Sequence, residues 1–334
     1  MAVQSYVLLS FLPLMNGLKG GKVMESTVEI AKRKKSHIKN KQLSDKLGSF
    51  LFVLPFLVAF TLFLLIPIIY GIYISLFQWN LLDNIPTYVG LENYIQLFTK
   101  GSYTYEVFVS TLGNTMLYAV ITVPLFTTAS LGLAILVNNV IPKLTGLFRT
   151  IFFFPYVLSL SVIGAAWALI FNPGAGLLNA LLAGIGLNPV AWNATPGGAW
   201  TMIIVTSLWW GIGFNMLLFI NALNNISNEL YEAADIDGAS IWKKFMCITL
   251  PSIQPIMMYV VITSTIGAFN LYGQPLLLTG GGPGTSTKVT MMSILDEAFI
   301  RHQLGSASAM AVVLGIISGL FILIQFIVTH RKEK

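Results

Sequence analysis

The feature that most constrains this chain is a run of 79 residues, 150–228, that contains no Asp, Glu, Lys or Arg. Four more charge-free stretches lie between Lys46 and Asp83, Glu106 and Lys143, Lys244 and Lys288, and Arg301 and Arg331. Each can hold the roughly 20 apolar residues that a helix needs to cross a bilayer core. Charged residues make up 10% of the chain, whereas an average soluble domain carries about 25%. A soluble enzyme is therefore excluded, and the sequence predicts an all-α, polytopic membrane protein.

Hydropathy along the chain predicts a bundle of six membrane-spanning helices. The predicted spans are residues 50–77, 108–137, 150–171, 200–222, 256–278 and 307–329. They form one transmembrane domain, 47–330, after a basic tail, 1–46, in which we expect translation to start at Met24. The apolar stretch 174–187 is too short to cross and is bracketed by Asn-Pro turn signals. We expect a short helix at the membrane interface there, with a re-entrant segment as the alternative.

The distribution of positive charge predicts the orientation. With both termini in the cytoplasm, 16 of the 19 Lys and Arg residues lie inside, and only Lys100, Lys288 and Arg301 lie outside. Such an excess on the inner side is typical of proteins in a bacterial-type inner membrane. The net charge of +6 is therefore interpreted as a topology signal within the lipid bilayer, and no nucleic-acid partner is expected.

The segment between the fourth and fifth predicted spans, residues 224–255, has the pattern of two short helices joined at Gly238. Asn228 can cap the first helix, whose opening turns are acidic, as the helix dipole favours. Gly238 gives the backbone freedom to bend, and Pro251 is expected to end the second helix. The second helix carries an apolar stripe at Ile241, Phe245 and Ile248. An amphipathic helix pair with an acidic leading edge is suited to docking on a partner.

The same segment contains a specific pattern of residues at fixed spacings. Its members are Glu232, Ala233, Ala234, Asp237, Gly238, Ala239, Phe245, Ile248, Leu250, Pro251 and Pro255. This pattern resembles the EAA loop of ABC importer permeases, and residues 224–255 are called the EAA loop below. Further segments resemble the maltose-type sugar permeases, namely residues 77–80, 89–94, 148–155, 278–287 and 298–299. The resemblance covers about residues 45–330 and is closest to the subunit type of the maltose permease's larger partner.

The resemblance implies a division of labour between subunits. Two permease subunits form the pathway, two ATPase subunits lie beneath it, and an extracellular solute-binding protein delivers a sugar or oligosaccharide. The EAA loop would dock on the ATPase, with Glu232 paired to a basic group and Ala233, Ala234 and Gly238 allowing close approach. The residues expected to couple to the ATPase are Glu232, Ala233, Ala234, Asp237, Gly238, Ala239, Phe245, Leu250 and Pro251.

ATP is expected to bind to another chain. The nearest candidate for a phosphate-binding loop, residues 280–284, lacks the following Gly-Lys-Ser/Thr and lies in a predicted outside loop. We therefore expect no cofactor on this chain, with ATP and Mg²⁺ on the partner ATPase. The sequence contains no catalytic constellation, and its single cysteine, Cys247, excludes an internal disulfide and a Cys-based metal cage.

Two predicted spans carry candidate residues for the substrate path. On the fourth span, Ser207, Trp210, Gly211 and Phe214 share one helical face, with Asn215 beside it. On the fifth span the candidates are Ser264, Gly267 and Asn270. Aromatic surface and amide groups suit the stacking and hydroxyl bonding of a sugar. The alternative is ordinary helix packing, in which small and polar residues hold membrane helices together.

Other function classes were weighed against an importer subunit. A membrane-embedded enzyme, an ion channel or a proton-coupled carrier would need ionisable groups or a filter within the spans. None of the six predicted spans contains Asp, Glu, Lys or Arg. Within the permease family, the alternative to a sugar is a solute such as glycerol phosphate or an amino acid.

Overall fold

The computed structural model describes residues 50–82, 85–139 and 142–330. The predicted basic tail and the expected start at Met24 lie outside these residues, so both stay predictions. The residues up to Tyr70 and those from Gly71 onward form two units, and each is described by itself.

The described residues confirm the all-α membrane class. They contain four helices long and apolar enough to cross a membrane, or up to six if each of two bent helix pairs counts as one span. The four are Phe50–Ile74, α5 (Tyr103–Asn138), α9 (Pro196–Asn224) and α16 (Leu304–His330). The first of them contains the π-helical turn η2 (Thr61–Leu65) and ends with α3 (Ile66–Ile74).

The third predicted span, residues 150–171, is a broken helix. α6 (Pro142–Val157) and α7 (Leu160–Ile170) follow each other across a two-residue gap, and the chain bends by 101° between them. Pro155 lies two residues before the end of α6, and Ser159 caps α7 by accepting a hydrogen bond from Val162 N at 3.4 Å. The expectation of one continuous helix is wrong here, because a proline and a new N-cap together favour a break.

The fifth predicted span, residues 256–278, is interrupted as well. α13 (Gln254–Phe269) ends at Asn270, and α14 (Gly273–Thr279) begins three residues later. Asn270 Nδ2 donates to Ile266 O at 2.8 Å and so satisfies a carbonyl in the last turn of α13. The prediction of a single helix missed this interruption because Leu271 and Tyr272 continue the apolar pattern.

The EAA loop joins α9 to α13. It contains α10 (Asn228–Ile236), α11 (Ile241–Lys244), the π-helical turn η3 (Phe245–Thr249) and α12 (Leu250–Ser252). The helix from Ile241 to Ser252 meets α13 at 68°. The predicted pair of short helices joined at Gly238 is therefore present.

The remaining elements are short. They are β1 (Phe77–Gln78), β2 (Thr87–Tyr88), α4 (Glu92–Phe98), α8 (Leu177–Gly184), α15 (Thr290–Leu295) and the π-helical turn η4 (Asp296–Ile300). β1 and β2 pair antiparallel, with Phe77 opposite Tyr88. α8 is the short helix expected within residues 174–187, and its position at the membrane interface stays a prediction. Asn179 holds the loop after α8 by accepting hydrogen bonds from Val190 N and Trp192 Nε1.

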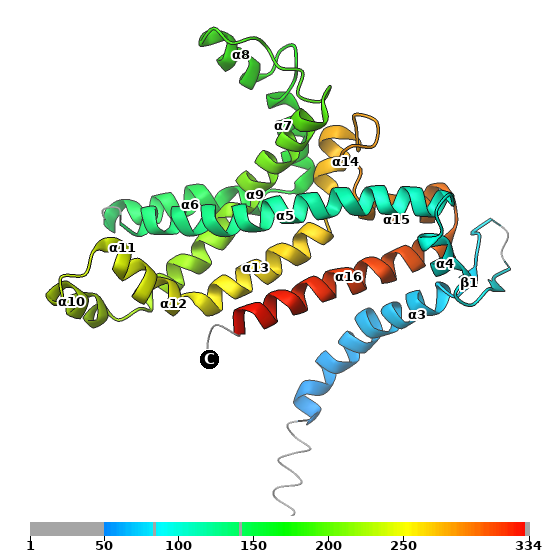
Figure 1. Ribbon diagram of the computed structural model, residues 1–334, viewed down its shortest axis with the longest axis horizontal. Helices are drawn as coiled ribbons and strands as arrows, with labels where there is room; N and C mark the ends of the chain where they lie inside the picture. The colour runs from blue at the N-terminus through cyan, green and yellow to red at the C-terminus, as the bar shows by residue number, and fades with distance from the viewer. Residues whose placement is uncertain (1–49, 83–84, 140–141, 331–334) are drawn as a thin grey trace, which may run out of the picture. The chain divides into compact units, whose positions relative to one another are not determined.

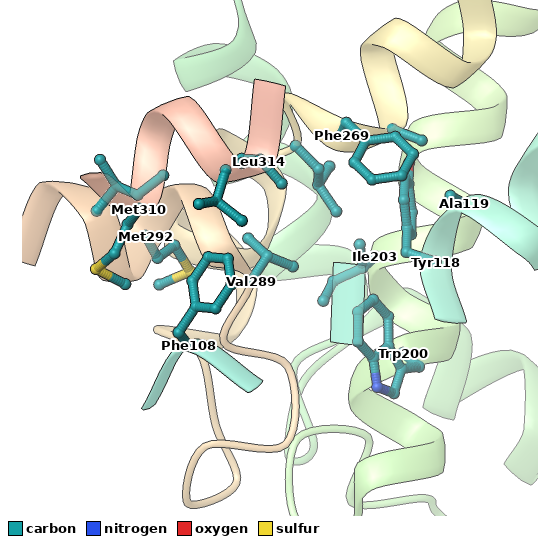
Figure 2. Packing of buried hydrophobic residues seen from close by; sticks show 14 of the residues in the cluster. Phe108, Tyr118, Ala119, Trp200, Ile203, Phe269, Val289, Met292, Met310 and Leu314 are labelled. Carbon is teal, nitrogen blue, oxygen red and sulfur yellow. The ribbon is translucent and has the colours of Figure 1, made fainter. Parts of the chain in front are cut away.

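The core of the second unit lies along α5. This helix packs against α9 and α13, while α6 packs on α9 and α13 on α16 (Figure 1). Figure 2 shows Phe108 of α5 beside Met292 and Met310, and Tyr118 near Trp200. The Tyr118 and Trp200 rings stack with their centroids 6.0 Å apart.

The contact between α6 and α9 depends on Gly213. A Cβ atom at this position would lie 1.9 Å from the carbonyl oxygen of Phe152, so no larger residue fits without movement of the backbone. We predict that Gly213→Ala destabilises the folded protein by on the order of 1–3 kcal/mol, as overpacking does. Thermal unfolding in detergent would measure the change.

The matched control is Gly132→Ala in α5, where a Cβ atom would meet nothing within 4 Å. Its effect should be neutral or stabilising by up to about 1 kcal/mol, since Ala favours a helix more than Gly. Equal melting temperatures for the two variants would contradict the packing argument.

Candidate functional site

A cavity of about 560 Å³ lies among α5, α9, α13, α14 and the break between α6 and α7. Every residue proposed from the sequence for the substrate path lines it. These residues are Ser207, Trp210, Gly211, Phe214, Asn215, Ser264, Gly267 and Asn270. Two helical faces that were recognised separately in the sequence thus meet across one space.

Other lining residues were missed by sequence reasoning. They include Tyr118, Thr122 and Phe126 of α5, Tyr156 and Leu160 at the α6–α7 break, and Tyr272 and Gln274 at the start of α14. The residues next to the two breaks had no usable signal, because a helical period cannot be extended across an interruption. Those of α5 lie in a long apolar helix whose faces the sequence does not distinguish.

One wall of the cavity is aromatic. The ring of Tyr156 stacks on Phe214 with centroids 4.9 Å apart and an interplanar angle of 19°, and it lies 6.3 Å from the ring of Trp210. Trp210 Nε1 is buried and has no hydrogen-bond partner within the described ranges. Flat aromatic surface with a free donor at its edge suits the C–H face and the hydroxyls of a sugar ring.

The polar groups of the cavity are amides and hydroxyls. Asn215 and Gln274 are only 7% and 8% exposed, and Thr122 and Ser207 are buried too. None of the lining residues is Asp, Glu, Lys, Arg or His. The cavity therefore offers neutral hydrogen-bonding groups and no charge that could balance an ion.

The first helix of the EAA loop begins at Ser227. Its Oγ accepts a hydrogen bond from Glu229 N at 3.3 Å, so Ser227 is the cap and Asn228 is the first helical residue. The prediction that Asn228 caps this helix is wrong by one position. Serine and asparagine are comparably good caps, so their order in the sequence could not decide between them.

Gly238 forms the bend of the EAA loop with φ of +68°, a left-handed conformation that glycine adopts readily. A Cβ atom there would meet nothing within 4 Å in this chain. The expected need for backbone freedom agrees with this geometry. Close approach at Gly238 does not occur within the described chain, so it could only concern a partner.

The second helix of the loop passes through Pro251 and ends at Ser252, with Ile253 as its C-cap. The expectation that Pro251 ends this helix is therefore wrong. Proline follows η3, in which Leu250 N donates to Phe245 O five residues back. The widened π-helical register accommodates a residue that lacks the usual donor.

Two side-chain pairs brace the EAA loop. Tyr231 OH and Thr249 Oγ1 share a hydrogen bond of 2.8 Å, and Lys244 Nζ lies 2.6 Å from Asp235 Oδ1. Each pair joins α10 to the second helix of the loop. The two helices are thereby held at a fixed angle across Gly238.

The outer surface of the EAA loop is acidic and apolar. Glu232 is exposed and forms no ion pair within the described part of the chain. Ile236 and Ile241, on either side of the bend, are 87% and 84% exposed, and Trp242 is exposed as well. Such large apolar side chains in the open mark an interaction surface.

Near the start of α16, three of the segments that resemble the sugar permeases lie together. Leu81 N donates to His302 O and Leu304 N to Trp79 O, each at 2.9 Å. Asn93 Nδ2 donates to Ser75 O at 2.8 Å and to Phe77 O at 2.9 Å. Residues 75–81, 89–94 and 297–304 thus form a tied structure, called the clasp below.

The family of the chain follows from comparison with known proteins. The family described as "Binding-protein-dependent transport system inner membrane component" matches residues 130–334. The chain belongs to this family. It is a multi-pass inner-membrane permease component of an ABC importer and not an enzyme, since ATP hydrolysis belongs to a separate subunit in this family.

Relatives of this permease match it over most of its length. It is 38% identical to the probable ABC transporter permease protein YurN of Bacillus subtilis strain 168, over 86% of this chain and 99% of the relative. The arabinooligosaccharides transport system permease protein AraP of Halalkalibacterium halodurans is 31% identical, over 95% and 99%. The trehalose/maltose transport system permease protein MalF of Thermococcus litoralis is 34% identical, over 80% and 87%.

A solved structure shows the same fold. A chain from the crystal structure of a bacterial ABC transporter involved in the import of the acidic polysaccharide alginate aligns with a TM-score of 0.75. The alignment covers 88% of this permease and 99% of that chain at 21% identity. The likeness supports the helical architecture described above.

The clasp of the permease contains a buried acid. Glu297 is buried, and its Oε2 lies 3.1 Å from Arg301 Nε, whose guanidinium lies 3.7 Å from the centre of the Tyr103 ring. Burial raises the pKa of the Glu297 carboxyl above its ordinary value of 4.5, and the charge of Arg301 partly opposes this. The fold therefore favours the protonated carboxyl over the ionised one.

This pKa shift predicts a pH dependence of stability. The contribution of neutral Glu297 is fully present below pH 4.5 and is lost as the pH rises through the raised pKa of the folded state. Glu297→Gln should remove this part of the pH dependence. Melting temperatures measured from about pH 4.5 to neutrality should fall less for the variant than for the parent, and parallel curves would contradict the prediction.

Proposed function

We propose that this permease translocates a sugar or oligosaccharide into the cytoplasm. The observation that carries the proposal is an uncharged cavity that is lined by stacked aromatic rings and by amides from the two predicted faces. Relatives named for arabinooligosaccharides, trehalose/maltose and lactose support a saccharide. Glycerol phosphate and amino acids are less favoured, because they carry charges that no lining residue balances.

The proposed assembly contains a second permease subunit, a pair of ATPase subunits that bind ATP and Mg²⁺, and an extracellular solute-binding protein. The family description refers to binding-protein-dependent transport. The solved alginate transporter was captured in complex with a periplasmic protein bound to an alginate pentasaccharide. Both support a binding protein as the donor of the substrate.

The proposed coupling follows from chain connectivity. The EAA loop leaves α9 after Asn224 and enters α13 at Gln254, and both helices line the cavity. A movement of the braced loop is therefore transmitted to two walls of the cavity through covalent connections. Closure of the ATPases would bias the bundle between inward-open and outward-open states by contacts that differ between them.

Both termini and the EAA loop are proposed to be cytoplasmic, and the clasp extracytoplasmic. We predict that single cysteines placed at Lys100 and Lys288 react with an impermeant maleimide added to intact cells. A cysteine at Lys243, in the EAA loop, should react only after the membrane is opened. The native Cys247 is exposed, so the variants need a Cys247→Ser background. Labelling of position 243 from outside would overturn the topology.

Substrate class and coupling can be tested together in proteoliposomes that contain the full importer. Uptake of labelled arabinotriose, maltose and lactose is measured with ATP inside and binding protein outside. At least one of these sugars should be transported. Transport of glycerol phosphate or an amino acid, with none of the sugars, would reject the proposed function.

Variants can distinguish the role of the EAA loop from the role of the cavity. Glu232→Ala should release the ATPase or uncouple hydrolysis from uptake, since losing one partner of a buried interfacial charge pair costs on the order of 2–5 kcal/mol. Gly238→Val should act likewise because valine is strained at positive φ, whereas Gly238→Asn should retain function because asparagine tolerates that conformation.

The control for these loop variants is Trp210→Ala in the cavity. It should lower uptake while the ATPase stays bound in a detergent pull-down. The coupling role is wrong if Glu232→Ala and Gly238→Val both keep the ATPase and transport at the parental rate.

A further inference from the structure

Gln274 is a buried amide without a partner. It lies in the first turn of α14, directly after the interruption of the fifth span, and lines the cavity. The residue is 8% exposed, and its amide forms no hydrogen bond with any described residue, although its polar atoms remain accessible from the cavity. By contrast, Gln325 of the spanning helix α16 does have a partner, since its Nε2 donates to Thr265 Oγ1 at 2.8 Å.

The backbone of Gln274 is fixed by close packing of α14 on α7. A Cβ atom at the neighbouring Gly273 would lie 2.0 Å from Leu160 Cδ2, and one at Gly164 would lie 2.7 Å from Leu277 Cδ1. These two contacts hold the start and the middle of α14 against the helix after the α6–α7 break. Gln274 is therefore presented to the cavity from a rigid wall, as recognition groups are in preorganised sites.

The chemistry of the amide indicates what would satisfy it. Because its polar atoms face the cavity and have no protein partner, the amide is free to hydrogen-bond with water or with a solute that enters this space. The group offers two N–H donors and an acceptor oxygen, which match a hydroxyl that donates and accepts. Asn215, buried and likewise without a described partner, presents the same groups from α9.

An anionic ligand would bind weakly in the same cavity. A carboxylate or phosphate taken into the cavity would lose its hydration and find no cationic side chain among the lining residues. It would also leave the acceptor oxygens of both amides unpaired.

We propose that Gln274 is a specificity-determining residue of this permease. Together with Asn215 it binds hydroxyl groups of an uncharged saccharide and discriminates against saccharides that carry carboxylate or phosphate. This inference rests on the proposed function and assigns the substrate class within it.

The test uses the full importer in proteoliposomes and whichever of arabinotriose, maltose and lactose the parent transports best. Gln274→Met keeps the length of the side chain and removes its hydrogen bonds. The value of kcat/KM for uptake should fall by about tenfold, the loss expected for one or two hydrogen bonds, with a rise in KM. The control is Gln325→Met, an amide outside this cavity, which should leave KM unchanged.

Charge discrimination is measured without the binding protein, on the purified permease–ATPase complex. The neutral sugar should change the tryptophan emission, and this signal should disappear in Trp210→Phe, which assigns it to the cavity. Trigalacturonate at the same concentration should give no Trp210-dependent signal in the parent.

The outcomes are distinct. A parent that transports glycerol phosphate or an amino acid and none of the three sugars overturns the proposed function itself. If the parent transports a sugar and an assembled Gln274→Met complex keeps the parental KM, or trigalacturonate gives the Trp210-dependent signal, the inference on Gln274 is wrong. If Gln274→Met fails to assemble with the ATPase, Gln274→Glu, which keeps the shape of the side chain but replaces its NH2 donors with a carboxyl group, decides by the same criteria.

Discussion

Inside a bilayer every backbone N–H and C=O must find its partner within the protein, and the rest of this structure depends on that constraint. The long helices α5, α9 and α16 satisfy it with their own helical hydrogen bonds, apart from the donor that Pro124 lacks within α5. The two interruptions, at residues 158–159 and 270–272, are tolerable only where the freed groups avoid lipid. Tyr156, Leu160 and Tyr272, which flank these interruptions, all line the same cavity. The cavity therefore shelters the interrupted backbone from lipid, and the interruptions in turn contribute residues to its lining.

The sequence predicted the faces of helices well and their interruptions poorly. A helical period of 3.6 placed Ser207, Trp210 and Phe214 on one side of α9, and the structure shows these residues lining one cavity. The bend at Gly238 was predictable because a glycine between two amphipathic segments has few other uses. Tyr156 and Gln274 could not be assigned to the cavity, since their positions depend on breaks decided by tertiary packing. The helix end predicted at Pro251 was wrong because the helix can accommodate this proline only after the π-helical turn that precedes it.

The two ends of the second unit differ in how they are held together. The clasp is tied by backbone hydrogen bonds and by Asn93, and the loop after α14 is anchored by Asn114 Nδ2, which donates to Lys288 O at 2.8 Å. The EAA loop is instead braced within itself, by the Tyr231–Thr249 and Asp235–Lys244 pairs. The clasp end is thus hydrogen-bonded between several segments, whereas the described hydrogen bonds and ion pair of the EAA loop lie mainly within the loop itself.

The braces of the EAA loop have a mechanical consequence. Ala239 N donates to Ala234 O at 2.9 Å across the bend, and two side-chain pairs span the angle, so the two helices of the loop are linked at three points. We expect a force applied at Ile236 or Ile241 to move the two linked helices together and to produce a torque about the ends of the loop. Because the loop is covalently continuous with α9 and α13, that torque should tilt both helices together, so that their facing side chains turn as a pair.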